Sequence, residues 1–372
     1  MIRAGNLIDQ IADLDNLRLA FVKARRGKQY SSDVLSFADN IDAELLSLRE
    51  SILSGDVCVG NYHTFEIYDP KQRTICAAAF GERVLHHAIM NICHPLFERH
   101  FIYDTYATRK GKGQYAAIGR AMKAFCRYDH VLKLDFRKYF DSIPHKLLKC
   151  KLLRLFKDKT LLKILFKIID TYSVTSGSGL PIGNLTSQYF ANYFLSDLDH
   201  YAKETLKIPC YVRYMDDILI FEPSKQLLKN DFEQIKAFAN HNCLALKPPI
   251  FSNYIKGVPF LGYKLYRHRI ILARRSRHRF ESKYYDYQYK LLSGVWSQEQ
   301  YQAHILPLIA FTEHAYSKRY RQKIVFPGKN RRSPTAFCVG ALGTTTQGTV
   351  AYRIATTTTL PTVTTTTGFA LP

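Results

Sequence analysis

Hydrophobic side chains along this chain recur at two spacings, one typical of helices and one typical of strands. Residues 1 to about 60 carry apolar positions such as Leu7, Ile8 and Ile11 at helical spacing, which predicts a helical region. The pattern predicts further helices at 82–100, 114–127, 145–170, 184–204, 226–241 and 275–325. It predicts hairpins at 62–78, 210–221 and 258–272, and a strand at 131–134. Together these elements predict an α+β fold.

The composition changes sharply from about residue 327. Residues 340–372 are dominated by threonine runs at 344–346, 356–359 and 364–367, and they show no pattern of core positions. Such a segment cannot bury enough apolar surface to offset its conformational entropy. We expect a low-complexity tail that is disordered or loosely packed.

The charge of the chain indicates a polyanionic partner. It has 53 lysine and arginine residues against 31 acidic residues, a formal net charge of +22, together with 13% aromatic residues. A strongly positive surface attracts phosphate and releases its counterions on binding, which favours a nucleic acid. Solubility alone, or attraction to an anionic membrane, would also account for the charge.

The remaining composition favours a soluble protein of a reducing compartment. Eight cysteines are scattered without a C-x-x-C pair, and no run of eighteen apolar residues or apolar signal core is present. These features argue against a zinc ribbon and give no support to a membrane span. We therefore expect a cytoplasmic location and no membrane partner.

Two adjacent acids lie at the centre of the strand-forming segment 211–221. Asp216 and Asp217 are flanked by β-prone residues on both sides, which predicts a tight hairpin with the acids at its tip. Two carboxylates between apolar strands are costly unless positive charge lies beside them, and a pair of magnesium ions would supply it. A solvated Asp-Asp turn is the simpler interpretation of this segment alone. Asp135, at the end of the strand at 131–134, supplies the third carboxylate that a two-metal site needs.

These acids occur in motifs that resemble those of reverse transcriptases. Tyr214-Met215-Asp216-Asp217 resembles the signature box of that family, and Asp135 matches the acid of its first palm motif. Further segments resemble two fingers motifs, the nucleotide-pocket motif and the primer grip, in this order at 73–75, 109–113, 180–188 and 257–263. The resemblance covers roughly residues 55–270. It implies a right-hand polymerase with fingers, a palm built on an antiparallel sheet, and a helical thumb.

The resemblance also implies how the chain is divided. We expect an N-terminal helical extension at 1–60, fingers at 61–130, a palm at 131–272 with a fingers insertion near 150–185, a thumb at 273–326 and the low-complexity tail at 327–372.

The family's functional positions can be carried over to this sequence. Asp135, Asp216 and Asp217 are the expected catalytic ligands of two Mg²⁺ ions, and the backbone carbonyl of Phe136 is a candidate further ligand. The expected nucleotide-binding residues are Lys71, Arg73, Phe140, Ile182 and Gly183. Lys71 and Arg73 would stabilise triphosphate charge. Phe140 falls at the sugar gate that selects deoxynucleotides, although plain core packing would also explain it.

A further set of positions matches the primer and template contacts of the family. These are Arg109, Lys110, Lys112, Ser187, Gln188, Tyr214, Phe260, Leu261 and Gly262. For Arg109, Lys110 and Lys112, solvated surface charge is an alternative to a grip on phosphate.

The pocket motif indicates a subtype. Ile182-Gly183 replaces the usual Gln-Gly, and Ser187-Gln188 replaces the usual Ser-Pro, which resembles the enzymes of diversity-generating retroelements. Those enzymes copy a template-repeat RNA into cDNA, misincorporate opposite adenine and so diversify a target gene. Isoleucine offers only apolar contact where glutamine can hydrogen-bond near the nascent base pair. Polar recognition discriminates between substrates more sharply than apolar contact does. Ile182 could instead do no more than pack the pocket floor.

The threonine runs supply a separate argument for this subtype. Threonine codons have the form ACN, so Thr runs arise when repeated AAC asparagine codons are read one base out of frame. Template repeats of this family are rich in AAC codons, so residues 340–372 could be a by-product of overlap between the gene and its template repeat. An ordinary low-complexity tail is the alternative.

The resemblance implies partners and leaves other functions open. The expected partners are template RNA, a cDNA or primer strand, deoxynucleoside triphosphates and a small basic accessory protein, in a bacterial or phage-encoded system. A retron or phage-defence reverse transcriptase remains an alternative, although the Asn-Ala-x-x-His and Val-Thr-Gly signatures of retrons are not found. A catalytically inactive nucleic-acid-binding relative is an alternative of another class.

Overall fold

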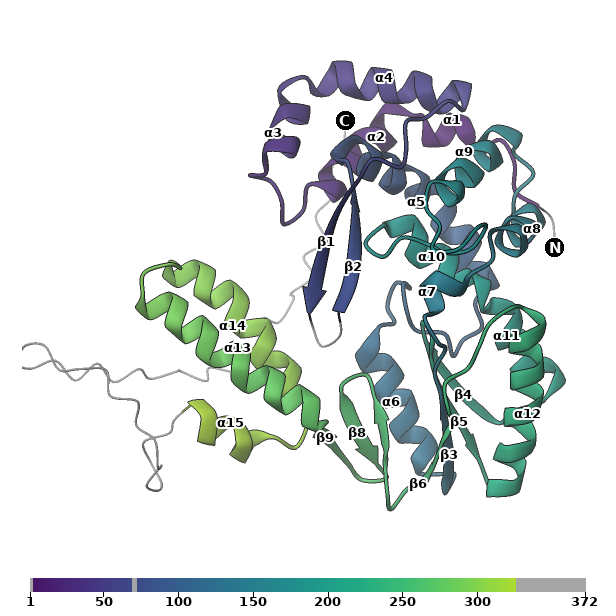
Figure 1. The fold of residues 1–372 in the computed structure, drawn as a ribbon, viewed down its shortest axis with the longest axis vertical. Coiled ribbons are helices and arrows are strands. Elements are labelled where there is room, and N and C mark those ends of the chain that lie inside the picture. The colour runs from purple at the N-terminus through teal and green to yellow at the C-terminus, as the bar shows by residue number, and fades with distance from the viewer. Residues whose placement is uncertain (1–2, 69–71, 326–372) are drawn as a thin grey trace, which may run out of the picture. The chain divides into compact units, whose positions relative to one another are not determined.

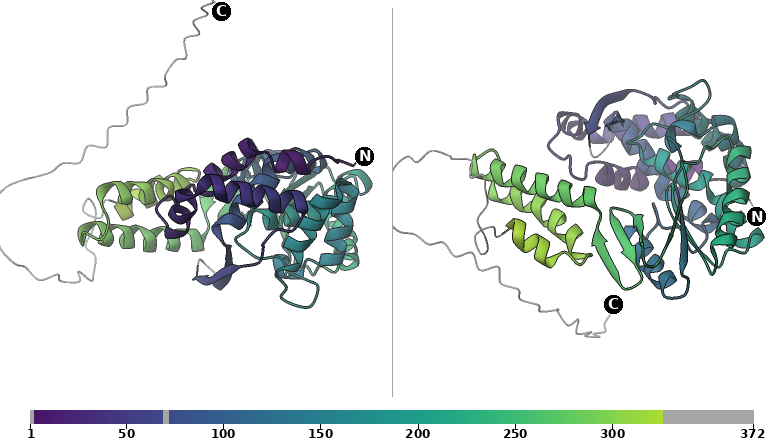
Figure 2. Two further views of the ribbon diagram at one scale, coloured as in Figure 1. Left: turned by 90° about the horizontal axis from the view of Figure 1, so that it is seen from above. Right: turned by 60° about the horizontal axis from the view of Figure 1, so that its bottom comes forward.

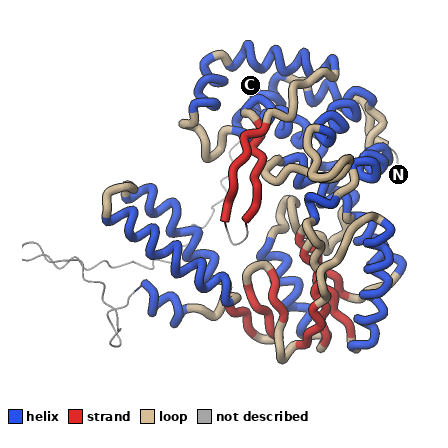
Figure 3. Tube along the Cα trace, in the orientation of Figure 1, coloured by secondary structure: helices blue, strands red, loops and turns tan. Residues whose placement is uncertain are grey.

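Helices and antiparallel sheets make up the described chain, which confirms the expected α+β class. The structure is a computed structural model that describes residues 3–68 and 72–325. Figure 3 shows the strands gathered in a hairpin and in two further sheets, with helices around them. The predicted tail at 327–372 lies outside the described residues.

Helices dominate the first part of the chain and the segment after residue 138. They are α1 (Ile8–Ile11), α2 (Leu14–Ala24), α3 (Ser32–Asp39), α4 (Ile41–Ser54), α5 (Phe80–His100), α7 (Tyr139–Ser142), α8 (His145–Leu155), α9 (Lys159–Asp170), α10 (Leu185–Phe194) and α11 (Ser196–His200), with the π-helix η1 (Tyr201–Thr205). In α9, leucine and isoleucine at helical spacing are all buried, so that one apolar face packs into the core. The predicted helical region at 1–60 is confirmed.

The predicted helix at 145–170 is in fact two helices, α8 and α9. Phe156 adopts an extended conformation after α8, and the Asp158 carboxylate then accepts a hydrogen bond from the Leu161 backbone N–H at the start of α9. The same carboxylate accepts from the backbone N–H groups of Leu7 and Ile8. The break therefore lets one acid cap a new helix and anchor the N-terminal segment.

A four-stranded antiparallel sheet lies below the N-terminal helices in Figure 1. Its strand order is β4-β5-β3-β6, from β4 (Cys210–Tyr214), β5 (Asp217–Glu222), β3 (His130–Leu134) and β6 (Ile250–Asn253). Alternate residues face opposite sides: Val131 and Leu219 pack with α6 (Gln114–Phe125), whereas Leu132 and Ile220 share a core with α12 (Lys225–His241). The sheet is thus covered on both faces and gives the ends of its strands fixed positions.

A two-stranded hairpin stands apart from this sheet. It consists of β1 (Tyr62–Tyr68) and β2 (Gln72–Ala78), paired from Tyr62 with Ala78 to Tyr68 with Gln72. The hairpin predicted at 62–78 is confirmed, and its turn at 69–71 lies outside the described residues. The two views of Figure 2 show the hairpin projecting from the N-terminal helices.

The last elements form a small sheet followed by helices. The sheet contains β7 (Val258–Phe260), β8 (Tyr263–Tyr266) and β9 (Arg269–Leu272), so the predicted hairpin at 258–272 has a third strand. The predicted helical stretch at 275–325 divides into α13 (Arg274–Leu292), α14 (Gln298–Glu313) and α15 (Lys318–Val325). Gly294, with a φ of 73°, follows α13 and allows the first reversal. Within the described ranges, no helix has both the length and the apolar character that a bilayer crossing needs.

Candidate active site

The predicted acidic hairpin is present, and its two acids lie at the turn between β4 and β5. Tyr214 pairs with Asp217, which leaves Met215 and Asp216 as a two-residue connection. Met215 has a φ of 56°, a left-handed conformation that is uncommon for a residue other than glycine. The turn therefore places Asp216 and Asp217 at the end of the sheet.

The third predicted acid follows the neighbouring strand. Leu134 of β3 pairs with Ile218 of β5, and the next residues in this register are Asp135 and Asp217. The backbone carbonyl of Asp135 accepts from the Lys247 N–H at 2.8 Å, so the segment before β6 is fixed beside it. Asp135, Asp216 and Asp217 line the same cavity. Sheet pairing thus brings Asp135 together with two adjacent carboxylates that lie far from it in the sequence.

The electrostatics of these groups show that they crowd one another. Burial raises the pKa of Asp217 to about 7, with further increases from the charges of Asp135 and Asp216. Burial also raises the pKa of Asp216, and Asp135 adds to that shift. Two cations offset part of the repulsion: Lys133 Nζ is 3.0 Å from the Asp217 carboxylate, and Lys247 Nζ is 2.6 Å from Asp135 Oδ2. The site is a cluster of carboxylates that favours positive charge.

The chemistry of this cluster fits a hard divalent cation. Its donors are carboxylate oxygens, the ligand type that magnesium prefers, and their mutual repulsion falls when a cation binds between them. In the chain as described, no three His, Cys, Asp or Glu side chains already converge on a single metal position. The ammonium groups of Lys133 and Lys247 contact the carboxylates instead. The two lysines satisfy only part of the hydrogen-bonding capacity of the cluster: Lys247 contacts Oδ2 of Asp135, and Oδ1 of Asp217 is buried without a hydrogen-bond partner among the described residues.

The cavity around the acids has a volume of about 840 Å³, and basic and aromatic residues make up much of the rest of its lining. Arg73 of β2 lies close enough to Asp216 for its charge to lower the pKa of that carboxyl. The small sheet contributes the predicted residues Phe260, Leu261 and Gly262 to the wall. The other lysine and arginine residues of the lining are Lys133, Lys247 and, from α13, Arg275, Arg279 and Lys283. A polyanion in this cavity would meet positive charge on several sides.

Ten predicted residues are described but are not among those that line this cavity. They are Arg109, Lys110, Lys112, Phe136, Phe140, Ile182, Gly183, Ser187, Gln188 and Tyr214. Ile182 is half-buried, and its carbonyl accepts from the Cys76 N–H at 2.8 Å, which attaches the segment before α10 to β2. Phe140 is half-buried in α7 and packs against the core. Phe136 is fully buried and forms an isolated bridge with Leu246. Lys71 lies outside the described residues.

The predicted phosphate-gripping run at 109–112 has mixed surroundings. Arg109 donates to Glu98 at 2.8 Å and to the carbonyls of Ile102 and Thr105, so its guanidinium is engaged within the protein. Lys112 donates to the Tyr103 carbonyl, whereas Lys110 is exposed. The guanidinium of Arg109 is thus held within the protein, whereas the side chain of Lys110 is open to solvent.

Several residues around the acids were missed by the sequence interpretation. Lys133 precedes Asp135 by two positions on a strand, so the two side chains share a face, and this signal was available. Lys247 lies 112 positions after Asp135, so the sequence gives no signal that pairs the two side chains. Arg213 is completely buried beneath the turn, and a single arginine within an apolar strand signals that a buried partner is needed. That partner, Asp199, has no sequence signal that identifies it.

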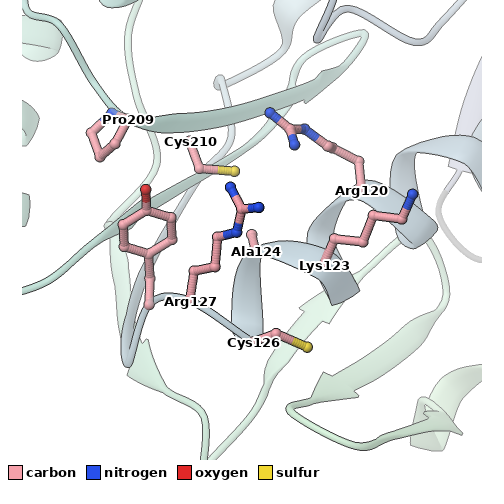
Figure 4. Close-up of a pocket in the computed structure, with 8 residues that line it drawn as sticks. Arg120, Lys123, Ala124, Cys126, Arg127, Pro209 and Cys210 are labelled. Carbon is pink, nitrogen blue, oxygen red and sulfur yellow. The ribbon is translucent and has the colours of Figure 1, made fainter.

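A second cavity lies at the opposite end of β4 and has a different character. Figure 4 shows Arg120, Lys123 and Arg127 around it, with Cys210 at the start of β4. Its volume is about 290 Å³ and its lining contains no carboxylate. This cavity therefore offers no ligands for a hard metal ion, unlike the one lined by the three aspartates.

Comparisons with known proteins agree with the motifs. The model of the family described as "Reverse transcriptase (RNA-dependent DNA polymerase)" matches residues 69–265. Protein YkfC of Escherichia coli is 27% identical over 180 residues, which are 43% of this chain and 46% of YkfC. The COX1/OXI3 intron 1 protein of Saccharomyces cerevisiae is 21% identical over 216 residues, 55% of this chain and 26% of that protein. The chain thus spans less than half the length of either relative.

Solved structures give a more distant likeness. The telomerase of Candida albicans, solved with a fragment of telomeric RNA, superimposes with a TM-score of 0.42 and 12% identity. That match covers 62% of this chain and 50% of the telomerase chain. The telomerase of Candida tropicalis gives a TM-score of 0.42 and 11% identity, and covers 57% of this chain and 55% of that one.

Proposed function

Because this chain belongs to the reverse transcriptase (RNA-dependent DNA polymerase) family, we propose that it is an RNA-directed DNA polymerase that extends a DNA primer along an RNA template. The observation that carries the proposal is that Asp135, Asp216 and Asp217 line one cavity whose other walls are largely basic and aromatic. Clustered acids within a positively charged groove suit nucleotidyl transfer, which needs metal ligands beside a nucleic-acid path.

The three aspartates would hold two magnesium ions. When bound, such ions supply positive charge that favours attack by the primer 3′-hydroxyl and stabilises the leaving pyrophosphate. Lys133 and Lys247, now paired with Asp217 and Asp135, offset the negative charge of the cluster before substrate binds. These contacts reduce the repulsion among the carboxylates, and bound metal ions would reduce that repulsion further.

Other residues of the cavity would orient the substrates. Arg73, close to Asp216, is placed to neutralise triphosphate charge, and the same role is proposed for Lys71. Phe260, Leu261 and Gly262 would contact the primer, and the basic helix α13 would follow the backbone of the duplex. In this assignment the four-stranded sheet is the palm, the β1–β2 hairpin belongs to the fingers, and α13 to α15 form the thumb.

Primer extension tests the polymerase assignment. A DNA primer annealed to an RNA template is incubated with deoxynucleotides, with Mg²⁺ or Mn²⁺, and with either the parent chain or Asp216→Asn. We expect extension by the parent and roughly a thousandfold slower extension by the variant, because the substitution removes a ligand of the catalytic metals. Asp170→Asn, which changes an exposed carboxylate paired with Lys149, is the matched control and should match the parent. Nucleic-acid binding without extension under either metal would favour the inactive relative.

We further propose that the enzyme is of the diversity-generating type and misincorporates opposite adenine. The motif at 180–188 supports this subtype, with Ile182 and Gln188 at its two distinguishing positions. Ile182 is tied through its carbonyl to β2, the strand that carries Arg73, so it lies in a segment coupled to the nucleotide-binding side. An apolar side chain there would leave base recognition less strict.

Error counting tests the subtype. RNA templates are copied by the parent and by Ile182→Gln, and the cDNA is sequenced. We expect errors concentrated opposite adenine in the parent and reduced by the substitution. An even error spectrum in the parent would favour the retron or phage-defence alternative.

A small basic accessory protein belongs to the same proposal, and its effect on extension of template-repeat RNA can be measured in parallel.

A further inference from the structure

A completely buried arginine lies directly beneath the acidic turn. Arg213 of β4 has no exposed surface, and its neighbour in the strand is Tyr214. Burial of a guanidinium is costly unless each of its N–H groups finds an acceptor. The hydrogen-bond partners of Arg213 therefore indicate the role of this side chain in the fold.

All five N–H donors of Arg213 have acceptors. Nε and Nη2 donate to the two carboxylate oxygens of Asp199, at 2.6 and 2.5 Å. Nη1 and Nη2 donate to the side-chain and backbone oxygens of Asn192, at 2.8 and 3.1 Å. The remaining N–H of Nη1 donates to the backbone carbonyl of Met215 at 2.9 Å. One end of the guanidinium is thus fixed by two helices, and the other end holds the turn.

The anchor itself is rigidly held. Asp199 of α11 has no exposed surface and accepts two more hydrogen bonds, from Thr105 Oγ1 at 2.9 Å and from the Tyr211 hydroxyl at 2.8 Å. Asn192 of α10 is equally buried and donates to the Ala107 carbonyl at 2.8 Å. The position of the guanidinium is therefore defined by α10, α11 and the loop before α6.

The turn that receives the fifth hydrogen bond is one that needs support. Met215 has a φ of 56°, whereas the first position of a two-residue turn with this backbone ordinarily favours glycine. Its carbonyl belongs to the peptide that leads into Asp216. The hydrogen bond from Arg213 therefore acts on the peptide unit that orients the carboxylate.

We propose that Arg213 is a positioning residue, which holds the Met215 carbonyl and thereby sets the arrangement of Asp216 and Asp217 for metal binding. The inference rests on the proposed function, because it concerns the metal site of that function. A buried ion pair is seldom the most stable way to fill a core, since apolar residues of similar volume serve as well or better. Its value here is geometric: a planar group with five donors joins the turn to the helices behind it.

Arg213→Lys is the variant that tests this role. Lysine retains the charge beside Asp199, but its single ammonium group cannot hold Asp199, Asn192 and Met215 at once. Tyr211→Phe is the matched control, because it removes one hydrogen bond from the same carboxylate and leaves the contact between Arg213 and Met215 intact. Both variants are compared with the parent by thermal melting, by Mn²⁺ binding in electron paramagnetic resonance, and by primer extension.

We expect Arg213→Lys to weaken Mn²⁺ binding and to raise the Mg²⁺ concentration for half-maximal extension, each by roughly 10-fold to 100-fold, as for other supports of metal ligands. The KM for primer–template should stay unchanged, because Arg213 does not line the cavity. Mn²⁺ should restore part of the activity, since it binds such ligands more tightly than Mg²⁺ does. Tyr211→Phe should show the parent's metal dependence.

Unchanged Mn²⁺ affinity and unchanged Mg²⁺ dependence in folded Arg213→Lys would overturn the inference. If that variant does not fold, Arg213→Gln combined with Asp199→Asn removes both charges, keeps an acceptor for Thr105 and Tyr211, and must show the same loss of metal affinity. A parent chain that extends no primer would refute the proposed function instead. A parent that also binds no Mn²⁺ would refute both.

Discussion

Gly183 offers a sharp test of how the pocket segment is coupled to the strand that carries Arg73. Its φ is +125°, a conformation that residues with a Cβ rarely adopt. A Cβ at this position would lie 2.9 Å from the carbonyl oxygen of Cys76 and 3.0 Å from Cγ2 of Ile75. Both contacts are with β2, so Gly183→Ala must push the pocket segment and β2 apart or distort one of them.

The size of the effect follows from these contacts. A side chain in so unfavourable a backbone region costs about 1–3 kcal/mol. Displacement also weakens the hydrogen bond from the Cys76 N–H to the Ile182 carbonyl, which contributes about 1 kcal/mol. We therefore expect Gly183→Ala to destabilise the protein by about 2–4 kcal/mol, a fall in Tm of roughly 3–6 °C for a chain of this length.

The functional consequence should appear in nucleotide binding. Because β2 carries Arg73 toward Asp216, a shift of the strand should raise the KM for deoxynucleotides about tenfold, with a smaller change in kcat. Gly177→Ala is the matched control: its φ is also positive, at +74°, but no atom of the described residues lies within 4 Å of the added Cβ. That variant should lose about 1 kcal/mol of stability and keep the parent's KM. Equal effects of the two substitutions would refute the coupling.

Three further predictions concern the core and the metals. Burial raises the pKa of Glu222 from 4.5 to about 7, so its stabilising contribution is complete below pH 4.5 and is lost as the pH rises through about 7. Because the neighbouring Asp231 also has a raised pKa, Glu222→Gln should reduce that decline rather than remove it, and should raise the free energy of unfolding at pH 8 by roughly 1–2 kcal/mol in urea denaturation. A decline identical to the parent's would contradict this prediction. Asp199→Ala should destabilise the protein by about 3–5 kcal/mol, because it leaves Arg213 buried without a counterion, whereas Asp56→Ala, at an exposed pair, should leave stability nearly unchanged. Chelation by EDTA should abolish primer extension and added Mg²⁺ should restore it; extension that survives chelation would argue against metal catalysis.

The local parts of the fold could be predicted from the sequence because they depend on neighbouring residues. Periodicity located the hairpin around Asp216 and the helix that became α12, within a few residues of their observed bounds. It could not show where a long helical pattern breaks, because the break between α8 and α9 depends on Asp158 reaching Leu7, a contact across the fold. Such breaks are decided by tertiary hydrogen bonds that no short segment contains.

In the candidate site, too, the sequence predicted some residues, whereas contacts between distant segments could not be predicted. The motif order identified Asp135, Asp216 and Asp217, and the sheet register brings them into one cavity. The lysine partner of Asp135 is Lys247, which is 112 positions away in the sequence and joins the site only through the segment before β6. The buried ion pair between Arg213 and Asp199 likewise joins a strand to a helix. Charged residues in apolar segments can be noticed in a sequence, but their partners are found only in the folded chain.

A crystal soaked with Mn²⁺ and examined by anomalous scattering would test the metal assignment most directly. We predict two anomalous peaks within coordination distance of Asp135, Asp216 and Asp217, with the ammonium groups of Lys133 and Lys247 moved away from the carboxylates. Peaks confined to other acidic residues, with both lysine pairs intact at saturating Mn²⁺, would contradict the assignment.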